Sequence, residues 1–168
     1  MTLSGLVSRD LPMTNKVPES AHVVIAPALY YLVGLLLGFG LDLVSDLIPG
    51  LPPSFRFSGI VLILAGMVLT GLALLTLYRS GTAIDPMKRT TRLVTSGVYR
   101  VSRNPAYLGL VFVYAGIALI GRSSASLALL PIVIALVWFQ VIRREESYLL
   151  SVFGEEYTRY SREVRRWL

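Results

Sequence analysis

Residues 93–109 read LVTSGVYRVSRNPAYLG, a polar, arginine-rich segment that separates two pairs of long apolar runs. The step Asn104-Pro105 opens the third apolar run, and the fourth run is followed by RREE at residues 143–146. Residues 79–104, which we call the polar loop, are the longest loop between the apolar runs. The charged, aromatic and glycine residues gathered in this segment therefore indicate that it holds a ligand.

The composition is that of a membrane protein, with 54% hydrophobic residues, 15% charged residues and a mean hydropathy of +0.65. About 20 apolar residues in a helix cross a hydrocarbon core of roughly 30 Å. Only Arg122-Ser123 separates the last two runs, which predicts a tight antiparallel hairpin. We therefore predict an all-α membrane protein with about four transmembrane helices, at residues 23–48, 58–78, 105–121 and 124–142.

The chain is expected to form a single domain over residues 1–168. Residues 1–22 are polar, lack the pattern of a cleavable signal, and are interpreted as a cytoplasmic lead. Residues 23–78 hold two spans, and residues 79–168 hold the polar loop, the helical hairpin and a C-terminal amphipathic segment. That segment, residues 143–168, is interrupted at Gly154 and is expected to lie along the inner membrane surface.

The placement of charge predicts the topology. The chain has a net charge of +6, and all of its 16 Lys and Arg residues except Arg56 and Arg122 fall on one side of the predicted spans. The positive-inside rule makes that side cytoplasmic and places both termini inside. Basic residues so placed attract anionic lipid headgroups, so membrane lipids are expected partners and nucleic acid is not.

Metal and thiol chemistry are not expected. The chain has no cysteine, and its single histidine, His22, stands at the mouth of the first span. One histidine cannot build a metal site, so we predict no metal and interpret His22 as an interfacial residue.

Small and acidic residues punctuate the first span. The run from Gly34 to Gly38 matches the small-xxx-small pattern that lets membrane helices approach closely, and packing within the chain is the favoured interpretation over a dimer face. Asp42 and Asp46 share one face near the outer end, where we expect both side chains to reach water.

The start of the third span is suited to anion binding. Asn is a favoured N-cap residue and Pro suits the first helical position, so Asn104 is predicted to cap a helix whose free amides and positive dipole end point at the cytoplasmic surface. Arg103 adds a fixed positive charge. The alternative is an ordinary helix cap whose neighbouring arginines bind headgroups.

Glu145 and Glu146 follow the fourth span on the same side. A short hairpin brings the two cytoplasmic ends together, so these acids are expected to face Arg103 and Asn104. Such a site suits a zwitterion, such as the amino-acid end of a cofactor. The alternative is that both glutamates pair with Arg143, Arg144 or loop arginines at the surface.

Residues 79–168 resemble the isoprenylcysteine carboxyl methyltransferase family and the related phospholipid methyltransferases. The resemblance lies in an ordered set of motifs. These are Leu93-Val-Thr-Ser-Gly-Val-Tyr99, Ser102-Arg-Asn-Pro-Ala-Tyr-Leu-Gly109, Glu145-Glu146, Val152-Phe-Gly-Glu-Glu-Tyr157, Tyr160 and Val164-Arg-Arg-Trp167.

The resemblance implies an integral membrane enzyme that uses S-adenosylmethionine. In such an enzyme Glu145 or Glu146 binds the polar end of the cofactor, and Arg143 or Arg144 faces the substrate. The catalytic residues expected from the resemblance are Arg143, Arg144 and Glu146. The cofactor-binding residues expected from it are Leu93, Val94, Tyr99, Arg103, Asn104, Pro105, Ala106, Tyr107, Glu145 and Glu146.

One departure concerns the start of the third span, where the family often has Arg-His-Pro and this chain has Arg103-Asn104-Pro105. Asn can donate and accept hydrogen bonds but cannot carry a proton. An acceptor that is already nucleophilic at neutral pH is therefore favoured.

The resulting hypothesis is S-adenosylmethionine-dependent methyl transfer to a lipophilic acceptor of isoprenoid, lipid or thiol type. The reaction is expected at the cytoplasmic face, in a prokaryotic inner membrane. The competing hypotheses are a membrane NADPH-dependent reductase of sterol-reductase-like type and a non-catalytic membrane adaptor. The sequence leaves the oligomeric state and the acceptor open.

Overall fold

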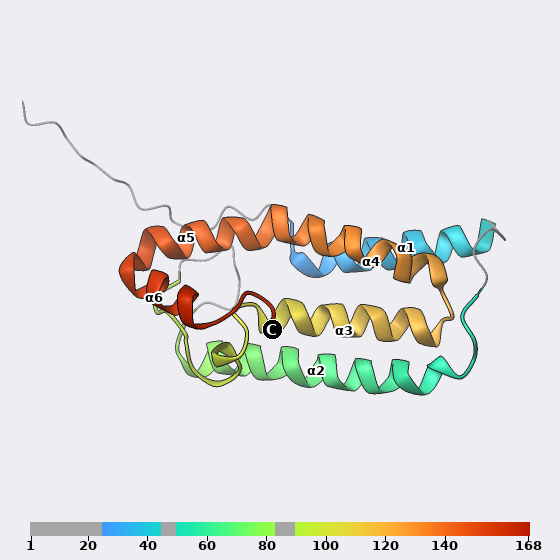
Figure 1. The fold of residues 1–168 in the computed structure, drawn as a ribbon, viewed down its shortest axis with the longest axis horizontal. Coiled ribbons are helices and arrows are strands. Elements are labelled where there is room, and N and C mark those ends of the chain that lie inside the picture. The colour runs from blue at the N-terminus through green and yellow to red at the C-terminus, as the bar shows by residue number, and fades with distance from the viewer. Residues whose placement is uncertain (1–24, 45–49, 83–89) are drawn as a thin grey trace, which may run out of the picture.

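The computed structural model describes residues 25–44, 50–82 and 90–168, and these residues form helices and connecting loops without a strand. The predicted lead at residues 1–22, His22 and Asp46 lie outside this part of the chain. In order, the helices are α1 (Pro27–Val44), α2 (Phe55–Arg79), the short 3-10 helix η1 (Gly97–Arg100), α3 (Pro105–Ile120), α4 (Ser124–Val137), the π-helix η2 (Trp138–Ile142), α5 (Arg143–Phe153) and α6 (Glu155–Glu163) (Figure 1). The all-α prediction is confirmed.

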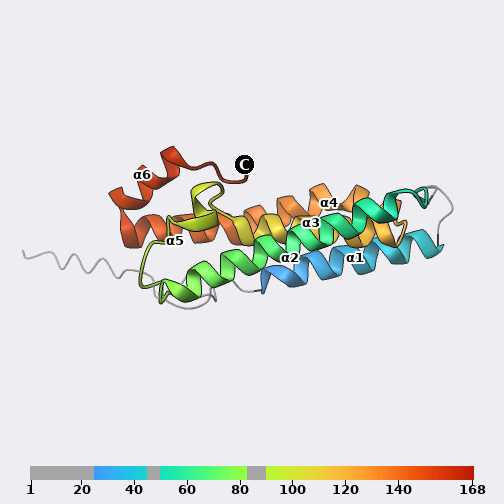
Figure 2. The same cartoon turned by 90° about the horizontal axis from the view of Figure 1, so that it is seen from below.

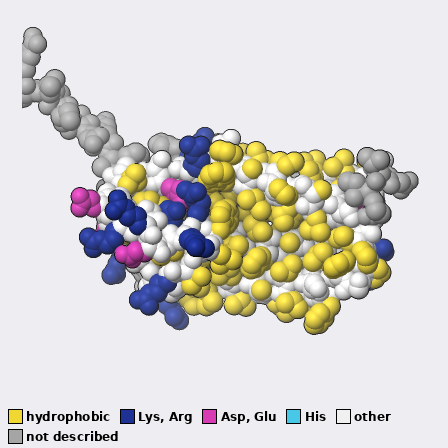
Figure 3. All heavy atoms as spheres, in the orientation of Figure 1, with side chains coloured by type: hydrophobic (Ala, Val, Ile, Leu, Met, Phe, Trp, Pro, Cys, Tyr) yellow, Lys and Arg dark blue, Asp and Glu magenta, His cyan; other side chains and the backbone are white. Residues whose placement is uncertain are grey.

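Three helices are long and apolar enough to cross a membrane, namely α1, α2 and the continuous helix Ser124–Phe153. The shorter apolar helix α3 has 16 residues, which extend about 24 Å at 1.5 Å per residue. Figure 3 shows that hydrophobic side chains cover most of the length of the visible face, whereas Lys, Arg, Asp and Glu gather at one end. We call the charged end, where α2 ends and α3 begins, the site end.

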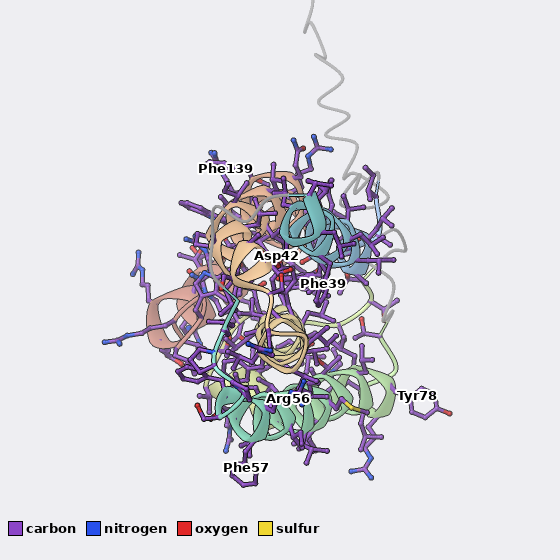
Figure 4. All side chains as sticks on the ribbon, turned by 90° about the vertical axis from the view of Figure 1, so that its right-hand side faces the viewer. Phe39, Asp42, Arg56, Phe57, Tyr78 and Phe139 are labelled. Carbon is purple, nitrogen blue, oxygen red and sulfur yellow. The ribbon has the colours of Figure 1, made fainter. Side chains whose placement is uncertain are left out.

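Helix α3 is the centre of the bundle (Figures 1 and 4). It packs along α2 on one side, and it contacts α1 and α4 on the other. Glycines permit the closest approach: a Cβ at Gly66 would lie 2.5 Å from the carbonyl oxygen of Gly109, and one at Gly59 would lie 2.8 Å from that of Gly116. Backbone contact of this kind is typical of membrane helices, whose association depends on van der Waals packing.

Helix α1 packs against α4 through the two glycines that the sequence singled out. Both are buried, and a Cβ at Gly34 would meet Val133 while one at Gly38 would meet Ser126. The prediction that this motif packs within the chain is confirmed. Because α1 packs on α4 and α2 packs on α3, α1 and α2 share no extensive interface. They lie next to each other in the projection of Figure 2, but Figure 1 shows α3 between them.

The α3–α4 connection is the predicted tight hairpin, which turns through Arg122 with a φ of 59°. The start of α4 is capped from within by Ser123, whose Oγ accepts a 3.0 Å hydrogen bond from the amide of Ser126. The start is also capped from α1, because Asp42 Oδ1 accepts a 3.2 Å hydrogen bond from the amide of Ala125. Figure 4 looks onto this end and shows Asp42 between the helices.

This arrangement corrects the expectation for Asp42. Asp42 is half-buried, and its Oδ2 is buried and has no hydrogen-bond partner among the described residues, so only part of the carboxylate can reach water. The reason is tertiary: the free amides at the start of α4 face α1, and they recruit the carboxylate.

A second correction concerns the segment after the fourth span. Helices α4, η2 and α5 follow one another without a break and run along one line in Figure 1, so α5 does not turn onto a membrane surface at Arg143 as expected. Gly154, with a φ of 50°, is the first residue that ends the helix, and α6 starts immediately after it. The predicted interruption at Gly154 is confirmed. A positive φ there suits glycine because it has no Cβ.

Candidate functional site

A cavity of about 390 Å³ opens at the site end of the bundle, between α1, α2, the polar loop, the start of α3, α5 and α6. Its wall includes every residue that the sequence assigned to cofactor binding. These residues are Leu93, Val94, Tyr99, Arg103, Asn104, Pro105, Ala106, Tyr107, Glu145 and Glu146. The structure thus brings together side chains from the loop, α3 and α5.

The polar loop is held in place by hydrogen bonds from several elements. The amide of Thr90 donates to the phenol of Tyr148 on α5 at 3.1 Å, and the amide of Thr91 donates to Thr82 at 3.3 Å. Further along, Tyr160 of α6 donates a 2.7 Å hydrogen bond to the carbonyl of Tyr99. These hydrogen bonds hold residues 93–99 at the edge of the cavity and explain why a loop can form one of its walls.

Asn104 stands directly before α3 and Pro105 occupies the first helical position, as predicted, but the Asn104 side chain does not cap the helix. Its Nδ2 instead donates a 3.0 Å hydrogen bond to the carbonyl of Arg166 near the C-terminus. The prediction of a side-chain cap is wrong. The reason is that the C-terminal residues lie beside the start of α3 and present a carbonyl acceptor to an amide donor that is only 8% exposed.

Glu145 lines the cavity and is bound by a neutral partner. It accepts a 2.6 Å hydrogen bond from the phenol of Tyr107, which belongs to the first turn of α3. Among the described residues, no Lys or Arg lies within 4.0 Å of its carboxylate. Glu145 is therefore an acid that faces the cavity with its charge uncompensated by an ion pair.

Glu146 is in the opposite situation, because it forms ion pairs with two arginines. Arg103 lies 3.2 Å from Oε1, and Arg166 binds both carboxylate oxygens, at 2.9 and 2.8 Å. The hydrogen bond to Glu146 raises the pKa of Arg166 above its usual value. The sequence analysis included Arg166 in a family motif but gave it no role in the site, because no spacing in the sequence places it near Glu146, 20 residues earlier.

The structure does not bring Arg143 and Arg144 to the cavity wall. Both side chains are exposed: Arg143 lies 5.7 Å from the ring centre of Phe139, and Arg144 donates a 3.3 Å hydrogen bond to Gln140. The two arginines follow the π-helix on the outer side of the long helix, and Phe139 points away from the bundle in Figure 4.

The phenols of the cavity are neutral groups. Burial raises the pKa of Tyr99 and of Tyr160 well above the usual value for tyrosine. Burial also raises the pKa of Tyr157, whose oxygen accepts a 3.3 Å hydrogen bond from Arg103. At neutral pH these side chains can donate hydrogen bonds and pack against a ligand, but they do not act as bases.

A second part of the cavity wall is apolar and was not predicted. It comes from the start of α1 and from the last turns of α2, the two helices that do not pack closely on each other. Its members are Ala26, Pro27, Ala28, Leu74, Leu77 and, with a single hydroxyl, Thr70. Their apolar character looked ordinary for membrane spans, so only the fold distinguishes them from lipid-facing residues.

The sequence profile of the phospholipid methyltransferase family matches residues 55–156. The chain is 28% identical over 141 residues to protein-S-isoprenylcysteine O-methyltransferase B of Arabidopsis thaliana, which covers 80% of this chain and 71% of the plant protein. It is 30% identical over 114 residues to a probable protein-S-isoprenylcysteine O-methyltransferase of Oryza sativa subsp. indica, and this match covers 67% of this chain and 60% of the rice protein. It is 35% identical over 72 residues to protein-S-isoprenylcysteine O-methyltransferase of Schizosaccharomyces pombe, covering 43% and 30%. No solved structure shows a significant match.

Proposed function

Because the chain belongs to the phospholipid methyltransferase family, whose members are membrane enzymes, we propose that it transfers a methyl group from S-adenosylmethionine to a lipophilic acceptor. The proposal places the reaction in the cavity at the site end, with the cofactor among the polar residues and the acceptor along the apolar wall.

The cavity residues fit the cofactor in size and in charge. A volume of about 390 Å³ lies within the range of roughly 300–1,000 Å³ that small-molecule sites occupy. Glu145 offers an acid without an ion-pair partner, and Arg103 Nε is buried with no hydrogen-bond partner among the described residues. A carboxylate without an ion-pair partner suits the ammonium of an amino-acid group, and an N–H donor without an acceptor suits its carboxylate.

The different partners of Glu145 and Glu146 also support one assignment over the other. We assign the cofactor's ammonium to Glu145, because Glu146 is already compensated by Arg103 and Arg166. The hydrogen bond from Tyr107 orients the Glu145 carboxylate within the cavity wall.

When bound, S-adenosylmethionine supplies a methyl group on a sulfonium, which is already an activated leaving group. The chain therefore has to align the reactants and exclude water more than it has to supply a strong base. Asn104 cannot accept a proton in place of an imidazole, and its amide is engaged with Arg166. We therefore infer an acceptor that is nucleophilic without deprotonation by the chain.

The acceptor is proposed to reach the cavity sideways from the bilayer, between α1 and α2. The apolar wall formed by Ala28, Leu74 and Leu77 comes from these two helices, and Leu74 is 37% exposed. An apolar chain entering there would remain in an environment like that of lipid until its reactive group meets the polar wall.

We place the site end in the cytoplasm, in a prokaryotic inner membrane. The support is the positive-inside rule, applied to the basic residues that gather at this end in Figure 3. Anionic headgroups on that side would attract the same residues.

The observation that carries the proposal is the uncompensated Glu145 in a cavity lined by the family's motif residues. The first test is isothermal titration of the protein in lipid nanodiscs with S-adenosylmethionine and S-adenosylhomocysteine, where we expect saturable binding of both. Absence of binding to either would contradict the proposal. Incubation of membranes with a methyl-labelled donor, followed by mass spectrometry of lipids and thiols, then identifies the acceptor. Addition of NADPH without methyl donor is the control for the reductase alternative.

A further inference from the structure

The C-terminal residues 164–168, which we call the C-terminal strap, lie across the start of α3 in the fold. The amide of Arg103 donates a 3.0 Å hydrogen bond to the carbonyl of Arg165. The carbonyl of Arg166 accepts two more hydrogen bonds, from Ser102 Oγ at 3.2 Å and from Asn104 Nδ2 at 3.0 Å. The strap is thus bound to three consecutive residues at the edge of the cavity.

Two of these hydrogen bonds have a buried donor residue, so water cannot easily replace the acceptor. Ser102 is 2% exposed and Asn104 is 8% exposed. If the strap detached while α3 kept its position, two buried donors would lose their acceptor, which is costly in a protein interior. Asn104 consequently holds the strap in place through its side-chain amide, and this role does not require a group that carries a proton.

The Arg166 side chain extends from the strap to α5. It binds Glu146 through two hydrogen bonds, in the bidentate geometry that suits a guanidinium and a carboxylate, and it lies 5.7 Å from the ring centre of Trp138. Arg166 itself does not line the cavity, whereas Glu146 and Arg103 do. Any influence of Arg166 on a ligand must therefore act through these two residues.

We propose that Arg166 is a positioning residue of the cofactor site, and that strap docking and cofactor binding are coupled. Together with Arg103, it engages Glu146 and so leaves Glu145 as the carboxylate that is open to the cofactor's ammonium. Without Arg166, Glu146 becomes a second acid that competes for that ammonium and for Arg103. This inference rests on the proposed function, and it adds a residue and a segment to that site.

The test compares three variants in lipid nanodiscs by titration with S-adenosylhomocysteine. Arg166→Ala removes the ion pair, and Arg166→Lys keeps the charge without the bidentate geometry. Arg162→Ala is the control for charge, because Arg162 is exposed on α6 and does not line the cavity. We expect the dissociation constant to rise at least tenfold in Arg166→Ala, to rise by a smaller factor in Arg166→Lys, and to stay within twofold in Arg162→Ala.

Tryptophan fluorescence reports the strap directly. The chain has two tryptophans, so Trp167→Phe leaves Trp138, next to Arg166, as the only emitter. In this background we expect Arg166→Ala to change the emission spectrum of Trp138. In the protein that keeps Arg166, we expect S-adenosylhomocysteine to shift the Trp138 emission, because the ligand favours the docked strap. No ligand-dependent shift in a protein that binds the ligand would overturn the coupling.

The outcomes separate the two proposals. If the unmodified chain binds neither S-adenosylmethionine nor S-adenosylhomocysteine, the proposed function fails and the role of Arg166 fails with it. If the unmodified chain binds and Arg166→Ala binds equally well, only the role of Arg166 is overturned. A lower unfolding temperature with an unchanged dissociation constant would show a purely structural role and would also overturn it. Should Arg166→Ala not fold, as judged by helical circular dichroism, Arg166→Lys decides: an unchanged constant overturns the proposal.

Discussion

The phenol oxygen of Tyr107 lies 2.6 Å from Oε1 of Glu145, and this hydrogen bond joins the start of α3 to α5 across the cavity. It brings together residues 38 positions apart in the chain. The contact holds one carboxylate toward the cavity, while the neighbouring Glu146 is engaged by two arginines. The two adjacent glutamates are thereby given different roles.

Glu145→Gln is expected to weaken binding of S-adenosylhomocysteine by about 10- to 100-fold, because charge-assisted hydrogen bonds contribute about 1.5–3 kcal/mol. The amide still accepts the hydrogen bond from Tyr107, so the fold should be kept. Isothermal titration measures the effect. Glu155→Gln is the matched control, since Glu155 is exposed on α6 away from the cavity wall, and equal weakening in both variants would contradict the assignment.

Tyr107→Phe should weaken cofactor binding less than Glu145→Gln, by roughly 3- to 30-fold. The carboxylate keeps its charge but loses its donor, and a hydrogen bond to a charged group is the interaction removed. The control is Tyr78→Phe, because Tyr78 is 73% exposed and points away from the bundle in Figure 4. The same titration applies, and a Tyr107→Phe protein with unchanged affinity would argue against an orienting role.

Leu74→Trp should obstruct the proposed entry between α1 and α2. We expect the KM for the acceptor to rise severalfold while the dissociation constant for S-adenosylhomocysteine stays within twofold, since Leu74 belongs to the apolar wall. Leu64→Trp is the comparison, because Leu64 is 58% exposed on the same helix and does not line the cavity. Similar kinetics for the two variants would rule out this route.

Gly66→Ala is expected to destabilise the bundle by about 1–3 kcal/mol, as overpacking does in close-packed interiors. The added Cβ would meet the Gly109 backbone at 2.5 Å, so α2 and α3 would have to separate. Gly71→Ala serves as the matched variant on the same helix, where a Cβ has nothing within 4 Å. Thermal unfolding in nanodiscs should show a lower Tm for Gly66→Ala and an equal or higher Tm for Gly71→Ala.

Asp42 is predicted to act through its capping oxygen. Asp42→Ala removes the acceptor for the amide of Ala125 and should lower stability by about 1 kcal/mol, the usual effect of losing a helix cap. Asp42→Asn keeps an oxygen acceptor and should remain close to the unmodified protein in a thermal unfolding experiment. Equal destabilisation by both substitutions would indicate that the charge, rather than the cap, is required.

Local patterns predicted the elements well, because helix formation in a membrane depends on apolar length and on turn residues near in sequence. The hairpin at Arg122-Ser123, the break at Gly154 and the start of α3 at Pro105 all follow from such signals and agree with the structure. The extent of the last span did not follow from them, because charged residues from Arg143 onward did not end the helix. A helix ends where its backbone hydrogen-bond pattern is interrupted, as at Gly154, and charged side chains alone do not interrupt that pattern.

The candidate site was predictable in its members but not in its internal contacts. Its motif residues are near one another in the sequence or adjoin a helix end, and they all line one cavity. The pairings were not predictable: Asn104 donates to Arg166 instead of capping α3, and Arg143 and Arg144 are exposed. Partners 62 residues apart, such as Asn104 and Arg166, leave no periodic signal in a single chain.

By itself, the sequence determined that this chain is a helical membrane protein and which residues form the polar end of its bundle. Hydropathy, turn chemistry and charge placement act locally, and they can be read one segment at a time. Only the tertiary structure decided that Glu146 is compensated by Arg166, that Glu145 is not, and that α1 and α2 share an apolar wall. Those distinctions depend on which side chains meet in space. An ion pair forms only between groups that lie close together, and the separation of two residues in the sequence does not give their distance in the fold.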